Sequence, residues 1–104
     1  MAYKIKATVI YDSDVDDTMD YIANVLYSPA AARNLRVKIR RTVMLIEDNP
    51  YIFPIYHDEE IAKLGYRFAV VSDYLLFYRV DEKNKVIYLL HFLNGRQNIQ
   101  MYIK

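Results

Sequence analysis

The stretch "YRFAVVSDYLLFYRV", residues 66–80, contains two short runs of β-branched and aromatic residues separated by "SD". Such runs favour strands, and a link this short predicts a β-hairpin. A hairpin on the surface of a soluble protein should alternate apolar with polar residues, so that one face is dry and one is wet. Here nearly every residue on both faces is apolar or aromatic. The sequence therefore raises the question of what covers the second face.

Two further β-runs flank this hairpin in the sequence. The run Lys85–Leu93 follows the hairpin across a "DEKN" turn, and the short links between Tyr66–Val71, Tyr74–Val80 and this run favour antiparallel pairing. Near the N-terminus, Tyr3–Ile10 alternates apolar with polar residues, as a strand near a sheet edge does. The chain is thus expected to contribute four strands.

Two amphipathic helices are predicted between the first strand and the hairpin. The first follows an aspartate-rich segment in which Asp12 or Ser13 is the expected N-cap, and it runs to about Tyr27. The second has Ser28 as its N-cap and Pro29 in its first position, and it extends to about Asp48. The apolar stripes at helical spacing are Val15, Met19, Ile22 and Leu26 in the first helix, and Leu35, Ile39, Val43 and Ile46 in the second.

The two helices carry opposite charge. Aspartates dominate the first helix, and four arginines lie off the apolar stripe of the second: Arg33, Arg36, Arg40 and Arg41. This favours an antiparallel helical hairpin, although exposed ion pairs of this kind each contribute only about 0–1 kcal/mol. Val37 and Met44 lie on the outward side of the second helix.

The order β-α-α-β-β-β predicts a single α+β domain over residues 1–104, with the helical hairpin packed on one face of a largely antiparallel sheet. Residues 49–65 contain two prolines and no clean period, so we expect an irregular connection there. The register of the hairpin stays open. A three-residue loop centred on Ser72 places Arg67, Ala69, Leu75, Phe77 and Arg79 on one face, whereas a two-residue Ser72–Asp73 turn moves one strand to the opposite face.

Composition limits the class of protein. The chain has 104 residues, no cysteine and a formal net charge of +1, which argues against a disulfide framework, a thiolate metal site and a strong long-range field for nucleic acid. The N-terminus lacks a signal-type apolar core and no segment is apolar enough to span a membrane, so the expected location is the cytoplasm. With 54% hydrophobic residues and only two glycines, a compact domain with an apolar surface is expected.

Generic enzyme motifs are missing from the sequence. It contains no Gly-rich phosphate loop, nucleophile elbow or paired-histidine metal motif. His57 is followed by Asp58, Glu59 and Glu60, but one histidine beside consecutive carboxylates lacks ligand geometry and indicates a solvated acidic loop. We therefore expect neither a metal nor a cofactor.

Several segments together resemble one family. "SPAAARNL", Pro50, "GYRFAVVSDYLLFYRVDE" and "HFLNGRQN" are similar to the RelE/ParE toxins of bacterial type II toxin–antitoxin modules, a family that includes plasmid stabilisation proteins. The most specific matches are Gly65-Tyr66-Arg67, the pair Tyr74 and Tyr78, and Gly95-Arg96.

This resemblance implies an answer to the question of the second face, because in these toxins an antitoxin segment wraps the domain and shields bare surface. It also supports the three-residue loop at Ser72. The alternative is that the chain's own C-terminal residues Ile99, Tyr102 and Ile103 fold back over the sheet.

The resemblance further implies one of two activities. RelE-like members cut messenger RNA on the ribosome, and ParE-like members inhibit DNA gyrase. As candidate catalytic residues for RNA cleavage, the sequence offers Arg67, His91 and Arg96, of which His91 would be the base or acid. Ala69 and Leu75 stand where RelE-like enzymes place further basic residues, so a ParE-like growth inhibitor is favoured. A ribosome-dependent nuclease and a degenerate interaction domain remain the alternatives.

The expected partners follow from the same interpretation. A cognate antitoxin is predicted to bind exposed apolar surface, and the target is gyrase or the ribosome with its message; a homodimer is left open. The predicted partner-binding residues are Ala69, Leu75, Phe77 and Arg79 on the sheet, with Val37 and Met44 on the second helix.

Overall fold

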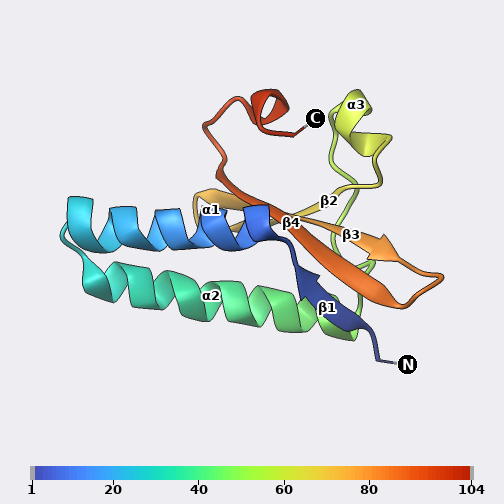
Figure 1. Cartoon of the computed structure of the whole chain (residues 1–104), viewed down its shortest axis with the longest axis horizontal. Coiled ribbons are helices and arrows are strands. Elements are labelled where there is room, and N and C mark those ends of the chain that lie inside the picture. The colour runs from blue at the N-terminus through green and yellow to red at the C-terminus, as the bar shows by residue number, and fades with distance from the viewer. Residues whose placement is uncertain (1, 104) are drawn as a thin grey trace.

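The computed structural model describes residues 2–103 and confirms the predicted α+β architecture. A helical pair lies on one side of a four-stranded sheet, and a short helix with a C-terminal turn lies on the other side (Figure 1). The elements are β1 (Lys4–Ala7), α1 (Val9–Asp20), the π-helical η1 (Tyr21–Val25), α2 (Pro29–Asp48), α3 (Glu59–Ala62), β2 (Arg67–Val71), β3 (Tyr74–Asp81), β4 (Val86–Asn94) and the 3-10 turn η2 (Ile99–Met101).

The strand order in the sheet is β1-β4-β3-β2. β1 is parallel to β4, and the other pairs are antiparallel. The main core lies between the sheet and the helical pair, where buried residues of α1 and α2 meet Leu76, Tyr78, Ile87 and Phe92. Within residues 2–103, no helix combines the length and the apolar composition that crossing a membrane requires.

The first helix begins earlier than the sequence predicts. β1 ends at Ala7, and the hydroxyl oxygen of Thr8 accepts a hydrogen bond from the Tyr11 amide at 3.1 Å, so Thr8 is the N-cap. The expected caps Asp12 and Ser13 therefore lie inside the helix. Val9 and Ile10 led to this error, because β-branched residues favour strands and yet here they are exposed residues of the first helical turn.

The second helix agrees with its prediction at both ends. Ser28 is the N-cap residue, Pro29 opens the helix and Asp48 closes it. Leu35, Ile39 and Ile46 are buried and Val43 is half-buried, as the apolar stripe indicated. In the first helix, Leu26 departs from the predicted stripe because it lies exposed at the end of the π-helical segment.

The turn between β2 and β3 has two residues. Val71 pairs with Tyr74, so Ser72 and Asp73 form the turn, and Ser72 has a positive φ of 55°. The three-residue loop that the family resemblance supported is therefore wrong. Phe68 pairs with Phe77 on the face away from the helical pair, and Ala69 pairs with Leu76 on the face that the helices cover.

The second face of the sheet is covered by the chain itself. Residues 49–65 include the short helix α3, which was not predicted, and the C-terminal segment folds back beside it (Figure 1). Ile99 and Ile103 are buried as the alternative required, whereas Tyr102 is about half exposed. The second core, on this face, consists of Tyr56, Ile61, Phe77, Leu93, Ile99 and Ile103. An antitoxin is thus not needed to cover Phe77.

Candidate functional site

His91 lies in an irregular part of β4. The register between β3 and β4 shifts there, because Phe77 pairs with His91 while the next residue, Tyr78, pairs with Leu89. Two groups from the start of α1 satisfy the backbone of this bulge. The Thr8 hydroxyl donates to the Leu90 carbonyl at 3.3 Å, and an Asp14 carboxylate oxygen accepts from the Phe92 amide at 3.0 Å.

The His91 side chain is largely shielded from water. It is 8% exposed, and its Nδ1 atom lies 3.9 Å from the same Asp14 oxygen that accepts the Phe92 amide. Burial lowers the pKa of His91, and the Asp14 carboxylate only partly opposes this effect. Burial raises the pKa of Asp14, and the hydrogen bond from the Phe92 amide and the nearby His91 only partly oppose this effect. Sequence reasoning missed Asp14, since nothing distinguishes it from the exposed aspartates around it.

Arg67 lies on the helix-covered face of the sheet, where it anchors the connection between α2 and β2. It pairs with Tyr78, whose side chain belongs to the helix-side core. The Arg67 Nη1 atom donates to the Phe53 carbonyl at 2.7 Å, and the guanidinium lies 4.9 Å from the centre of the Tyr51 ring. These contacts fix the connection between α2 and β2, and they direct the cation away from the face on which His91 packs with Phe77.

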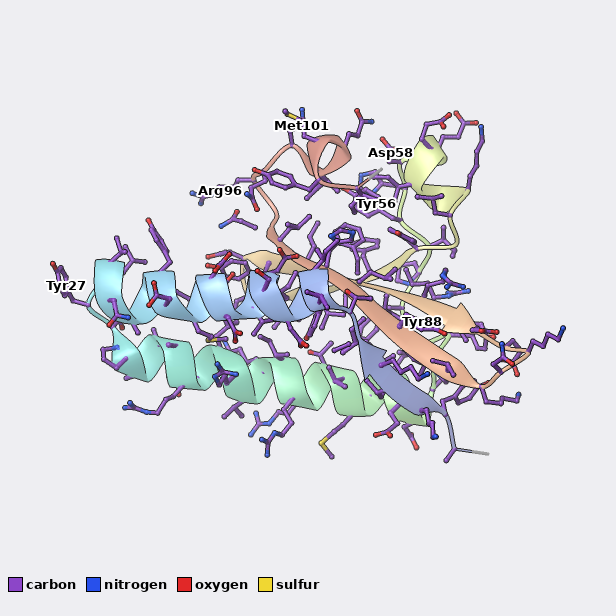
Figure 2. The ribbon with its side chains drawn as sticks, in the orientation of Figure 1. Tyr27, Tyr56, Asp58, Tyr88, Arg96 and Met101 are labelled. Atoms are coloured by element: carbon purple, nitrogen blue, oxygen red, sulfur yellow. The ribbon has the colours of Figure 1, made fainter. Side chains whose placement is uncertain are left out.

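Arg96 is exposed in the turn after β4, at the site labelled in Figure 2. The Asn94 side chain accepts a hydrogen bond from the Arg96 amide at 2.9 Å and shapes this turn. Arg96 borders an open hollow of about 470 Å³ together with Tyr21, Tyr74 and Phe92. Arg96 lies beyond the Tyr74 end of β3, whereas Arg67 pairs with Tyr78 farther along that strand and His91 packs with Phe77 on the opposite face. The structure therefore does not gather Arg67, His91 and Arg96 into one site.

The predicted partner-binding residues fall into two groups. Ala69 and Phe77 are buried, so they offer no surface to a partner, and this part of the prediction is corrected. The reason is the two-residue turn, which places Ala69 under the helices, together with α3 and the C-terminal segment, which cover Phe77. Leu75 and Arg79 are half-buried, and the Arg79 guanidinium lies 5.0 Å from the centre of the Tyr88 ring.

Val37 and Met44 are exposed on α2, by 46% and 61%. Met44 borders a groove between α1 and α2, of about 310 Å³, that has an apolar floor of Val15, Ile39 and Val43. The cations Arg36 and Arg40 form its rim. An apolar floor with a cationic rim suits a protein segment that carries both apolar and acidic side chains.

The acidic loop after His57 has a structural role at Asp58. The Asp58 carboxylate caps α3 by accepting hydrogen bonds from the Glu60 and Ile61 amides at 3.0 and 3.2 Å, and it also accepts one from the Gln100 side chain. These hydrogen bonds, that from Gln100 first, lower the pKa of Asp58. Across residues 2–103, no group of three or more His, Asp or Glu side chains is arranged to hold a metal ion.

Comparison with known proteins adds a family and a fold. The family model described as "ParE toxin of type II toxin-antitoxin system, parDE" matches residues 5–99. The chromosomal ParDE system from P. aeruginosa is similar in structure, with a TM-score of 0.70, 20% sequence identity, and coverage of 89% of this chain and 96% of that chain. The toxin–antitoxin complex RelBE2 from Mycobacterium tuberculosis has a TM-score of 0.57 and 17% identity, over 90% of this chain and 99% of that one. The chain has no significant match among curated proteins.

Proposed function

The chain belongs to the ParE toxin family of type II toxin–antitoxin systems, and on that premise we propose that it slows growth by inhibiting DNA gyrase and cleaves no nucleic acid itself. In this proposal the protein works in the cytoplasm by binding its target. A cognate antitoxin holds it inactive until the antitoxin is lost.

The observation that carries the non-nucleolytic proposal is the dispersal of the candidate catalytic residues. Cleavage of RNA without a metal needs a base, an acid and cationic donors around one phosphate. Arg67 is engaged with Phe53 and Tyr51 on the helix side, while His91 packs against Phe77 on the other side. The sheet face that carries His91, opposite the helical pair, is covered by the apolar second core.

The antitoxin partner is supported by the groove on α2. Both similar structures have the names of toxin–antitoxin assemblies, and an antitoxin segment with alternating apolar and acidic residues would fit this chain's groove. Apolar side chains would rest against Val43 and Met44, and carboxylates would meet Arg36 and Arg40. Val37, exposed on the same helix, extends the apolar contact.

The RelE-like nuclease remains a second candidate because of one contact. The Asp14 carboxylate lies 3.9 Å from His91 Nδ1, which is how a carboxylate orients a catalytic imidazole. Against this role, the imidazole is nearly buried and no cation of the candidate set lies with it. A degenerate interaction domain is the third candidate.

Induction of the chain alone, followed by three measurements, separates these candidates. Under the gyrase proposal, plasmid supercoiling falls, purified gyrase is inhibited by purified protein, and messages in translating ribosomes stay intact. Codon-specific cuts soon after induction would replace this proposal with the nuclease. A harmless chain that gains neither soluble yield nor relief of growth from the neighbouring open reading frame would indicate the degenerate domain.

A further inference from the structure

The end of the helical pair that lies farthest from the sheet has an irregular backbone. After Asp20 the helix continues as the π-helical η1, and it closes with hydrogen bonds from the Leu26 amide to the Tyr21 carbonyl and from the Ser28 amide to the Ile22 carbonyl, both 3.0 Å. Tyr27 follows with a positive φ of 53° and projects from this end in Figure 2. π-Helical segments are rare and are frequent at functional sites.

This end of the molecule is also apolar. We define the hairpin tip as Tyr21, Val25, Leu26 and Tyr27, all of them at least half exposed, with Tyr27 86% exposed. Ile22 is the residue of this segment that packs into the core. Four large apolar side chains within seven residues are thus exposed at this end, and exposed apolar surface of this kind often marks an interaction site on a small domain.

Tyr27 gives the fold no visible benefit. A residue with a Cβ atom is strained at positive φ, and glycine is the usual residue in this position after a helix. The Tyr27 side chain is almost wholly in solvent, so burial does not compensate for the strain. A strained and exposed tyrosine is consistent with a contact made outside the chain, because tyrosine is among the residues that contribute most to interfaces.

The charge around the tip indicates the chemistry of the partner. Asp17 and Asp20 are exposed in the last turn of α1, directly before the tip, and the first cation of α2, Arg33, follows Tyr27 by six residues. Asp16 lies 4.0 Å from Arg36 and is partly neutralised by it, and Asp20 accepts a hydrogen bond from Asn24 at 2.7 Å, so Asp17 and Asp20 form the acidic border of the tip. Nucleic acid would be repelled by this border, whereas a basic protein surface would be attracted to it.

We propose that the hairpin tip docks into an apolar pocket bordered by lysines or arginines on the target protein. This inference rests on the proposed function, since it names the surface of the toxin that meets the target. The tip lies at one end of the helical pair and the antitoxin groove lies along it, with the opposite charge at its rim. A basic border is expected on enzymes that handle DNA, because they bind phosphates.

Tyr27→Gly tests the proposal without unfolding the protein, because glycine relieves the strain at positive φ. The variant should be at least as thermostable as the wild type. It should need about tenfold or more protein to inhibit purified gyrase, as loss of a central interface tyrosine does, and it should slow growth far less on induction. Asp20→Lys should weaken inhibition in the same direction. Affinity for the antitoxin should be unchanged in both.

Two matched controls lie on the other side of the sheet. Tyr102→Ser removes another half-exposed tyrosine, and Glu59→Lys reverses another exposed acid; both should inhibit as the wild type does. Tip variants that stay as inhibitory as the wild type would overturn the docking surface while leaving the proposed function in place. A toxic wild type that does not inhibit gyrase removes gyrase as the target, and the growth assay then decides whether the tip is needed. A wild type that neither slows growth nor inhibits gyrase overturns both.

Discussion

The burial of His91 beside Asp14 makes the stability of the fold depend on pH. Burial lowers the pKa of His91 below its ordinary value of 6.5, so the folded protein holds this imidazole neutral where the unfolded chain already binds a proton. The stability that depends on the neutral imidazole is therefore present above pH 6.5 and is lost as pH falls toward the folded pKa. Burial raises the pKa of Asp14 above 3.8, so burial of this carboxylate costs stability at neutral pH, and that cost is relieved as pH falls through the raised pKa.

We predict that His91→Gln reduces the loss of stability between pH 7 and pH 5.5. Urea unfolding measures the free energy of unfolding at each pH. Because the substitution changes packing equally at both pH values, that change cancels in the difference. His57→Gln, at the exposed histidine, is the control and should keep the wild-type difference. An unchanged loss in His91→Gln would show that another group governs the acid limb.

The family resemblance marked Arg67 as a candidate catalytic residue, but its contacts in the structure are structural. Its donor bond to the Phe53 carbonyl and its place over Tyr51 hold the segment that leads into β2. We predict that Arg67→Ala lowers the free energy of unfolding by about 2 kcal/mol, since a bond from a charged donor contributes about 1.5–3 kcal/mol. Growth inhibition should persist at temperatures where the variant is folded.

The nuclease alternative predicts the reverse result for the same change. In that case Arg67→Ala would abolish toxicity with little effect on urea unfolding. Arg79→Ala is the matched control, because Arg79 also stacks on a tyrosine but, within residues 2–103, its side chain donates no hydrogen bond to a carbonyl. Its loss should cost only about 0.5–1 kcal/mol.

At the scale of elements, the sequence predicts well where one periodicity dominates. The stripe of α2 and the Ser28-Pro29 start placed that helix correctly, because spacing and a proline in the first position act locally. The start of α1 was missed, since Val9 and Ile10 favour a strand locally, whereas the Thr8 hydroxyl caps the helix and also donates to Leu90 on a distant strand. The turn at Ser72 was open for the same reason: local sequence allows two registers, and packing of Leu76 and Tyr78 under the helices selects one.

The candidate site was less predictable than the fold. The sequence motifs suggested that Arg67, His91 and Arg96 act together. In the structure, strand alternation and the β4 bulge place their side chains in different surroundings. The helix α3 was also hidden, because it has four residues and is fixed by the Asp58 cap and by Ile61 packing on Phe77, which is distant in sequence. Family resemblance identified the class of protein and not the positions of its working side chains.

At the scale of the whole molecule, both faces of the sheet are closed by the chain. Ile103 is buried in the second core beside Ile99 and Phe77. We predict that Ile103→Ala lowers the free energy of unfolding by about 2 kcal/mol, the lower end for a buried isoleucine, because a chain terminus relaxes more readily than a central strand. Tyr102→Ala, at a half-exposed neighbour, should change it by less than about 0.5 kcal/mol. Equal effects in urea unfolding would indicate that the C-terminal segment does not pack on the sheet in solution.

The charge separation between the two long helices permits a test of whether antitoxin and target use different surfaces. The rim of the groove on α2 is cationic at Arg36 and Arg40, while the border of the hairpin tip is acidic. We predict that Arg40→Glu weakens antitoxin binding by about tenfold or more, because a like charge then faces the acidic segment, and that antitoxin affinity of the wild type falls as salt rises.

The same variant should inhibit growth as strongly as the wild type when induced alone, and the antitoxin should rescue it poorly. Arg33→Glu, on the same helix but outside the groove lining, is the matched control for reversal of charge. Titration calorimetry with the purified antitoxin measures the first effect and induction without antitoxin measures the second. If Arg40→Glu loses toxicity together with antitoxin binding, one surface serves both partners, and the antitoxin then neutralises the toxin by direct competition at the groove.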